Sequence, residues 1–273
     1  MVIQENSLKK VLNIDEHKIE TSITKIEPNK IITRGFSQED LIANISCSEM
    51  VYLLFKGELP SKKEAKILNH VLISFCDHGV TPPSTQSSRL IASSGSPLNS
   101  ALAGGLLSFG KKHAGAIEES MELFQEIIKN HRSTDQNISE LAKNIVEYYL
   151  AKNEKIPGFG HRYHSKDPRA AKLIELVKED DFIGPHLELV LAIEDILFDK
   201  KRIHINVDGV NAAILLDMGF SSTLGFGVFM IGRIPGIIAH INEECTDEEE
   251  FRKFCDIKDI SYCGDENKFL DRI

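Results

Sequence analysis

Apolar residues recur three or four positions apart along most of the chain, which is the spacing of one face of an α-helix. Strand-like alternation is limited to residues 18–26 and 30–33, which predict a small N-terminal ribbon at most. The stretches that predict helices are residues 41–54, 98–109, 121–128, 138–150, 168–177, 183–198, 210–218 and 226–241, and a further helix begins at residues 60–64. The pattern therefore indicates an all-α, or mainly α, fold.

Local signals mark the ends of some of these helices. Gly57 follows the first helical stretch, at a position where a glycine often ends a helix. Ser61 and Glu64 have the spacing of a capping box, and so do Thr246 and Glu249. We therefore expect one helix to start at Ser61 and another at Thr246.

Length and charge narrow the function classes. The chain has 273 residues, enough for one large domain or two small ones with a sizeable core. Its formal net charge is −9, which argues against non-specific binding to nucleic acid or to an anionic membrane. A few clustered cations can still dominate a pocket, so an anionic small substrate stays open.

The sequence shows no targeting segment. The N-terminal residues have no apolar core of the kind that a secretory signal needs. The longest apolar run, residues 226–241, contains Arg233, Pro235 and His240 and is shorter than the roughly 18–20 residues that span a bilayer. We expect a buried helix there, no membrane insertion, and a cytoplasmic protein.

The five cysteines support the same compartment. Their odd number and scattered spacing are typical of reduced thiols in a cytoplasm. Cys76 and His78 form a weak metal-binding pair, but no second pair follows at zinc-finger spacing. No metal site is predicted.

Several polar residues beside apolar segments are candidates for chemistry, and each also has a structural explanation. His78 or His113 taken alone is more often a helix cap or a surface residue. Asp208 has the residue type of a helix N-cap, and a cap is as good an explanation as a functional role. Arg233, within an apolar run, could be paired with an acidic partner, because a buried charge must be compensated.

The segment around His161 is the most informative. Two glycines, Gly158 and Gly160, make a tight turn with exposed backbone directly before this histidine. Asp167-Pro168 then predicts a helix start, which puts Arg169 in a first turn where the helix dipole disfavours a cation. We expect the arginine and the backbone N–H groups there to share one anion.

These segments together resemble the citrate synthase family. GFGHRYHSKDPRA resembles the family's histidine loop, and NVDGVNAAILLDMGF is similar to the segment that carries its catalytic aspartate. ITRGFSQEDLI, LLFKGELPSKKE, CDHG, HAGAIEE and GRIPGIIAH match further family stretches in order, from about residue 31 to residue 262. Each match alone is weak, but their order makes the set specific.

The resemblance implies a citrate synthase-like fold, with a large helical domain of residues 1–115 and 216–273 and a smaller inserted domain of residues 116–215. It implies an active site in the cleft between them, a homodimer, and no metal or redox cofactor. The family joins the methyl group of acetyl-CoA to the keto carbon of oxaloacetate, or reverses that step.

The resemblance also implies roles for individual residues. Asp208 would remove the methyl proton, His113 would hydrogen-bond the thioester oxygen, and His161 would protonate the oxaloacetate carbonyl. The residues that would hold substrate carboxylates are His78, Arg169 and Arg233. Those that would contact coenzyme A are Gly158, Phe159, Gly160, Arg162 and Lys166.

Within the family, DHGVTPPSTQSSRLIASSG, SALAGGLLSFG and DISY resemble the citryl-CoA lyase module of ATP-citrate lyase and free-standing short citryl-CoA lyases. The C-terminal segment lacks the Arg-Pro pair at which synthases place a further carboxylate-binding arginine, and Arg272 is a poor replacement. In contrast, His113 makes the chain resemble a synthase, because the ATP-citrate lyase module has an aromatic residue at this position. The prediction is citryl-CoA cleavage to acetyl-CoA and oxaloacetate.

Three alternatives stay open. The first is citrate synthase activity, because the same residues serve both directions. The second is an acyltransferase that uses another 2-oxo acid. The third is a non-catalytic protein that binds coenzyme A or a tricarboxylate.

Overall fold

A computed structural model describes residues 19–131, 137–251, 253, 255–265 and 268–269. The chain divides into two compact units, residues 1–69 and residues 70–273. The mainly α fold predicted from the sequence is confirmed, since strands occur only near the N-terminus of the described residues. Arg272 lies outside the described residues.

The first unit contains the ribbon and the first helices. Three antiparallel strands lie in the order β1 (Thr24–Glu27), β2 (Lys30–Thr33) and β3 (Phe36–Ser37), with Ile26 opposite Ile31. Helices α2 (Gln38–Asn44) and α3 (Cys47–Lys56) follow, and α4 (Lys62–Phe75) runs on into the second unit. The helical stretch predicted over residues 41–54 is thus two helices.

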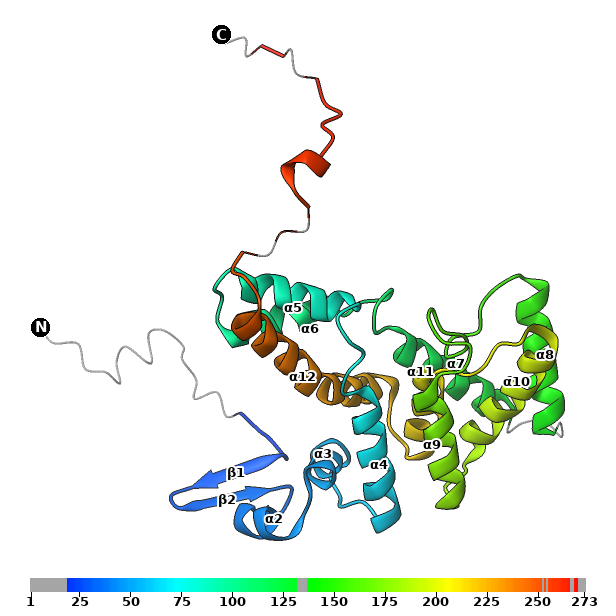
Figure 1. Cartoon of the computed structure of the whole chain (residues 1–273). Helices are drawn as coiled ribbons and strands as arrows, with labels where there is room; N and C mark the ends of the chain where they lie inside the picture. The colour runs from blue at the N-terminus through cyan, green and yellow to red at the C-terminus, as the bar shows by residue number, and fades with distance from the viewer. Residues whose placement is uncertain (1–18, 132–136, 252, 254, 266–267, 270–273) are drawn as a thin grey trace, which may run out of the picture. The chain divides into compact units, whose positions relative to one another are not determined.

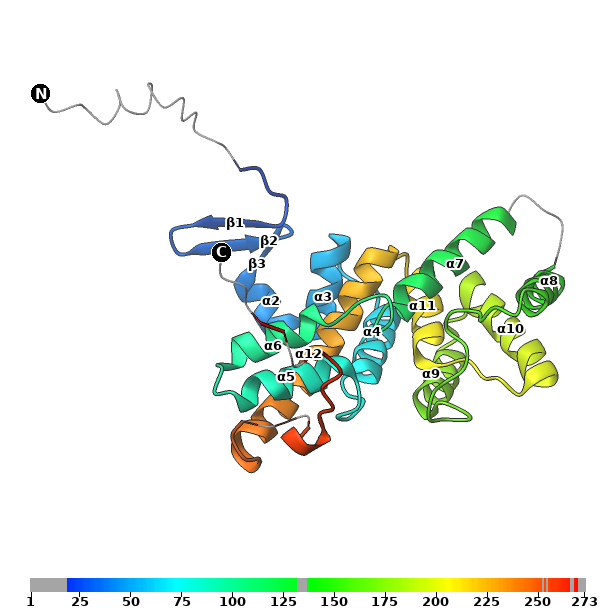
Figure 2. The same ribbon diagram turned by 90° about the horizontal axis from the view of Figure 1, so that it is seen from above.

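The second unit is a set of packed helices. Their bounds are α5 Pro83–Ser93, α6 Leu98–Leu107, α7 Ala116–His131, α8 Ile138–Ala151, α9 Pro168–Glu179, α10 Pro185–Lys201, α11 Val207–Asp217 and α12 Ser222–Asp247, followed by the short 3-10 helix η1 Ile257–Asp259. Helix α12 packs against α5, α6 and α7, and α10 packs between α8 and α11 (Figures 1 and 2). The loops at the ends of these helices supply most of the candidate site.

Two buried clusters hold this unit together. One joins α7, α8 and α10 through side chains that include Ile128, Val146 and Ile193. The other joins α5, α6 and α12 through Ala92, Ala101 and Ile237. Burial of such side chains contributes about 1.5–3 kcal/mol for each large aliphatic group, so packing fixes the helix ends that carry the polar loops.

The predicted helix ends were partly right. Gly57 ends α3 with φ +83°, and Ser61 and Glu64 exchange both capping-box hydrogen bonds, 2.8 and 3.2 Å long. Thr246 was wrong as a helix start: it lies inside α12, and its hydroxyl donates to the Asn242 carbonyl oxygen at 3.0 Å. The Thr246 hydroxyl bonds back to a carbonyl oxygen four positions earlier, which is the alternative to capping that a threonine has inside a helix.

Helix α12 is long and apolar enough to cross a membrane by length and composition alone, which the sequence analysis did not anticipate. Its most apolar 18-residue window has a mean hydropathy of 1.6, and 44% of that window is buried against the rest of the protein. A core helix passes the same test, and the contacts with α5, α6 and α7 are those of a core helix.

The proposed division into residues 1–115 with 216–273 and residues 116–215 stays a prediction.

Candidate active site

A cavity of about 260 Å³ in the second unit brings together residues that lie far apart in the sequence. Its lining includes all of the predicted catalytic and carboxylate-binding residues, which are His78, His113, His161, Arg169, Asp208 and Arg233. Of the predicted coenzyme A contacts, Gly160 and Arg162 line this cavity, while Phe159 and Arg162 line a neighbouring one of about 350 Å³. Gly158 and Lys166 line neither of these two cavities.

Asp208 lies in the first turn of α11, but it does not cap that helix. The N-cap is Asn206, whose Oδ1 accepts hydrogen bonds from the backbone N–H groups of Asp208 (3.0 Å) and Gly209 (3.1 Å). The structural explanation of Asp208 as a cap is therefore wrong. Its carboxylate makes no hydrogen bond or ion pair within the described part of the chain and lines the cavity.

The electrostatics of Asp208 suit a proton acceptor. Burial raises the pKa of its carboxyl to about 6, although the charges of Arg169 and Arg233 oppose the rise. A carboxylate with a pKa near neutrality combines basicity with a useful ionised fraction at physiological pH.

The glycine-rich turn before His161 is fixed against the start of α11. The Asn206 N–H donates to the Gly158 carbonyl oxygen at 2.9 Å, and its side-chain Nδ2 donates to the Gly160 carbonyl oxygen at 2.7 Å. A Cβ atom on Gly158 would lie 2.6 Å from the Gly209 Cα, so the two backbones meet only because both residues are glycine. This contact brings His161 and Asp208 to one cavity.

The hydrogen bonds of His161 determine where its proton lies. Backbone N–H groups of Tyr163 and His164 donate to its Nδ1 at 3.1 and 3.2 Å. A nitrogen that accepts two such bonds carries no proton, so the neutral ring is protonated at Nε2. Burial and neighbouring positive charges, among them Arg169, lower the pKa of His161, which favours this neutral donor form.

His113 is held in a similar way with the opposite tautomer. It closes a tight turn in which Gly110 and His113 exchange backbone hydrogen bonds of 2.7 and 2.8 Å. Its Nε2 accepts from the Ser84 backbone N–H at 3.3 Å and lies 2.9 Å from the Ser84 hydroxyl. The proton therefore lies on Nδ1, and burial together with Arg233 lowers the pKa of His113.

Arg233 is a cation that lacks an anion. Its side chain, in the middle of α12, is 7% exposed, and its Nη1 is buried without a hydrogen-bond partner in the described structure. Its guanidinium carbon lies 5.6 Å from the centre of the Phe229 ring. A buried donor left unsatisfied costs about 1–3 kcal/mol, and more when it is charged, so this group favours an anionic ligand in the cavity.

The contacts of Arg169 correct the sequence interpretation of the anion expected at the start of α9. The anion that its side chain and its own backbone N–H bind is the carboxylate of Asp167, with Arg169 Nη2 to Asp167 Oδ2 at 3.0 Å. The sequence analysis missed this because Asp167 was taken only as a cap. Arg169 also lines the cavity, next to His78.

His78 stays uncharged beside the two arginines. Burial and the charges of Arg169 and Arg233 lower the pKa of His78 to about 4. Its ring lies edge-on to that of His161, with centroids 5.4 Å apart. The cavity therefore presents neutral imidazole donors and fixed cations, which together suit a carboxylate-bearing ligand with a carbonyl group.

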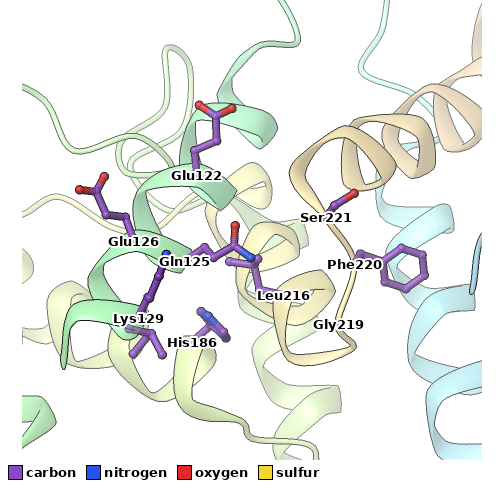
Figure 3. A pocket seen from close by; sticks show the side chains of 10 residues that line it. Glu122, Gln125, Glu126, Lys129, His186, Leu216, Gly219, Phe220 and Ser221 are labelled. Carbon is purple, nitrogen blue, oxygen red and sulfur yellow. The ribbon is translucent and has the colours of Figure 1, made fainter. Parts of the chain in front are cut away.

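A larger cavity of about 730 Å³ contains none of the predicted residues. Helix α7 supplies Glu122, Gln125, Glu126 and Lys129 on one side, and the turn before α12 forms the other side (Figure 3). His186 lies there too, with its Nδ1 2.7 Å from Asp217 Oδ1. The charged residues of its lining, Glu122, Glu126 and Lys129, are exposed, whereas Arg233 is buried.

No cluster of three or more His, Cys, Asp or Glu side chains with metal-binding geometry occurs among the described residues. Cys76, which directly follows α4, has its Sγ 3.6 Å from the Leu72 carbonyl oxygen.

Sequence reasoning did not identify Ser84, Asn206 or the double role of Asp167. Ser84 and His113 are 29 positions apart, so no local pattern could join them. Asn206 could have been found, since an asparagine two positions before Asp208 is itself a strong N-cap signal.

Comparisons with known proteins agree with this arrangement. Residues 60–253 match the family model described as "Citrate synthase, C-terminal domain". The citrate synthase of Heyndrickxia coagulans is 33% identical over 220 residues, which cover 77% of this chain and 56% of that protein. The chain spans 56–62% of the length of three curated synthases that it matches.

Two solved structures are also similar. The structure of citryl-CoA lyase from Hydrogenobacter thermophilus is 36% identical, with a TM-score of 0.82 that covers 92% of this chain and 97% of that chain. ATP citrate lyase from Methanothrix soehngenii, in complex with citrate and coenzyme A, is 21% identical with a TM-score of 0.79, over 98% of this chain and 45% of that chain. The second likeness concerns the fold alone.

Proposed function

The chain belongs to the citrate synthase family, and we propose that it is a citryl-CoA lyase, which cleaves citryl-CoA to acetyl-CoA and oxaloacetate. The observation that carries this proposal is the likeness to citryl-CoA lyase at 36% identity over 97% of that chain. The cavity described above supports it, since a base, two imidazole donors and two arginines line one space.

Each side chain has a defined task in this reaction. Arg169, Arg233 and His78 bind the substrate carboxylates. In the synthesis direction Nε2–H of His161 gives its proton to the carbonyl oxygen of oxaloacetate as the carbon–carbon bond forms. Cleavage is the reverse: Nε2, which carries no proton while citryl-CoA is bound, takes the hydroxyl proton back, and the central carbon–carbon bond breaks. Its electron pair passes into the thioester as an enolate, which His113 Nδ1–H stabilises by hydrogen bonding, and the Asp208 carboxyl gives its proton to the carbon that becomes the methyl group.

His113 and Asp208 are each expected to make a large contribution to the rate of the carbon–carbon step. One positioned donor to a developing oxyanion contributes about 2.7–4 kcal/mol, the range expected for His113. A positioned acid or base contributes roughly 10²–10⁴-fold, the range expected for Asp208. This chemistry uses only the protein's own side chains and the coenzyme A thioester, so we propose that no metal or redox cofactor takes part.

A second candidate is citrate synthase, which forms citrate and coenzyme A from acetyl-CoA, oxaloacetate and water. The 33% identity to the Heyndrickxia coagulans synthase favours it, and so does the histidine at position 113. Both reactions share the carbon–carbon step and differ in whether the thioester is hydrolysed. We further propose a cytoplasmic homodimer, as the family resemblance implies.

Side-by-side rates separate the two candidates. We expect purified protein to cleave supplied citryl-CoA to acetyl-CoA faster than it releases free coenzyme A from acetyl-CoA plus oxaloacetate, because thioester hydrolysis needs its own water-positioning geometry. Acetyl-CoA is followed by chromatography and free coenzyme A with a thiol reagent. Fast release of coenzyme A without cleavage of citryl-CoA would favour the synthase, and tight binding without either reaction would favour the non-catalytic alternative.

A further inference from the structure

Asp167 is a buried carboxylate at the junction of α9 and α11. The residue is 1% exposed, and its side chain accepts four hydrogen bonds. Three come from Arg169, from the backbone N and Nε at 3.1 Å and from Nη2 at 3.0 Å. The fourth comes from the backbone N–H of Val207 at 3.1 Å. Four charge-assisted bonds hold this carboxylate in one orientation.

The contacts orient the guanidinium of Arg169. Asp167 engages its Nε and Nη2 atoms, which form one edge of the planar group. The remaining donors, Nη1 and the outer N–H of Nη2, form the other edge and make no hydrogen bond among the described residues, and Arg169 lines the cavity. A guanidinium fixed on one edge presents the other for two-point binding of a carboxylate.

The fourth hydrogen bond connects Asp167 to the start of the helix that carries Asp208. Val207 is the first residue of α11 and directly precedes Asp208, so its N–H bond to Asp167 fixes the backbone at that point. One carboxylate thus connects an arginine that faces the ligand with the helix start that carries the proton acceptor. A helix cap for α9 alone would need only the bond from the Arg169 backbone.

Charge is the second link between these residues. The charged groups that act on Asp208 are Asp167, the N-cap of α9, Arg169 in the first turn of α9, and Arg233 from α12. The other titratable residues that line the cavity are His78, Lys112, His113, His161, Arg162 and Tyr163. Asp167 opposes ionisation of Asp208, and Arg169 favours it. Asp167 therefore offsets part of the effect of Arg169 on Asp208.

We propose that Asp167 is a positioning residue that holds Arg169 ready for a substrate carboxylate and balances its charge, so that Asp208 remains a base matched to neutral pH. This inference rests on the proposed function for the reaction, but the charge balance is a property of the free protein.

The test is to measure the pKa of Asp208 in the variant Asp167→Asn. Asparagine keeps an acceptor but removes the negative charge and leaves Arg169 uncompensated. Both changes favour the ionised form of Asp208, so its pKa falls from about 6 by about one pH unit or more. The pKa is measured by carbon-13 NMR of the aspartate carboxyls, with Asp208→Asn to identify the signal. In activity assays the acid limb of kcat/KM moves by the same amount, and KM for oxaloacetate rises.

Asp217→Asn is the matched control. Asp217 is another buried carboxylate that caps a helix, through the backbone N–H groups of His186 (3.0 Å) and Leu187 (2.9 Å), but it does not line the cavity. We expect it to lower thermal stability and to leave the pKa of Asp208 unchanged. An equal shift in both variants, or none in Asp167→Asn, overturns the proposal.

A second variant addresses folding. Asp167→Ser keeps a short side chain that caps α9 well and carries no charge, so the same shift is expected. If neither variant folds while Asp217→Asn does, Asp167 is a structural cap and the proposal fails. An inactive protein with the expected NMR shift would contradict the proposed function and leave the positioning role intact.

Discussion

Replacing Asp208 by asparagine is expected to lower turnover by about 10²–10⁴-fold and to leave the fold intact. Asparagine has nearly the same shape but cannot take or give the proton at the thioester carbon. The Asn206 cap and the packing of α11 do not use the Asp208 side chain, so the helix is expected to remain. Initial rates with citryl-CoA, and with acetyl-CoA plus oxaloacetate, measure the loss.

Stability provides an internal check on this variant. The pKa of Asp208 is raised from 3.8 to about 6 in the folded protein, so ionisation costs stability progressively between those values and fully above pH 6. Removing the carboxylate removes that cost, and the thermal midpoint at pH 8 should be equal to or above that of the unmodified protein. The exposed Asp199→Asn is the control for activity. Near-normal turnover in Asp208→Asn would contradict the mechanism.

Replacing Arg233 by alanine is expected to weaken oxaloacetate binding by about 2–5 kcal/mol, or about 30- to 5,000-fold in Kd. Arg233 is 7% exposed, and its Nη1 lacks a partner in the described structure. Removal of the arginine therefore deprives a bound carboxylate of a desolvated contact. Isothermal titration calorimetry gives the two affinities.

Lys129→Ala is the matched control for this loss of charge. Lys129 is an exposed cation near the end of α7. It lines the larger cavity of about 730 Å³ but not the cavity that contains Arg233, so its removal should change Kd little. Equal and small effects from Arg233→Ala and Lys129→Ala would show that Arg233 does not contact the substrate.

Helices were predictable wherever local chemistry determines their ends. Gly57 ends a helix because only a glycine adopts φ +83° without strain, and Asp167-Pro168 starts one as predicted. The prediction for Thr246 failed because its hydroxyl bonds back to the Asn242 carbonyl oxygen inside α12, which ends at Asp247. Asp208 was considered as a cap because its residue type suits one, but Asn206, two positions earlier, already satisfies the free N–H groups.

The site was predictable only through the resemblance of ordered motifs. Taken singly, His78, His113 and Arg233 have ordinary structural explanations, and nothing in the local sequence brings them to one cavity. What the sequence could not supply were contacts between distant segments, such as Ser84 with His113 and Asp167 with Val207. Those contacts determine proton positions and charge balance, and they depend on packing.

The most direct test of carbon–carbon bond chemistry in this cavity is product analysis of a single turnover, with protein in excess over citryl-CoA. The proposed mechanism predicts one acetyl-CoA and one oxaloacetate for each citryl-CoA, detected by mass spectrometry of the quenched mixture. Unchanged citryl-CoA, or citrate and free coenzyme A in place of acetyl-CoA, would contradict it.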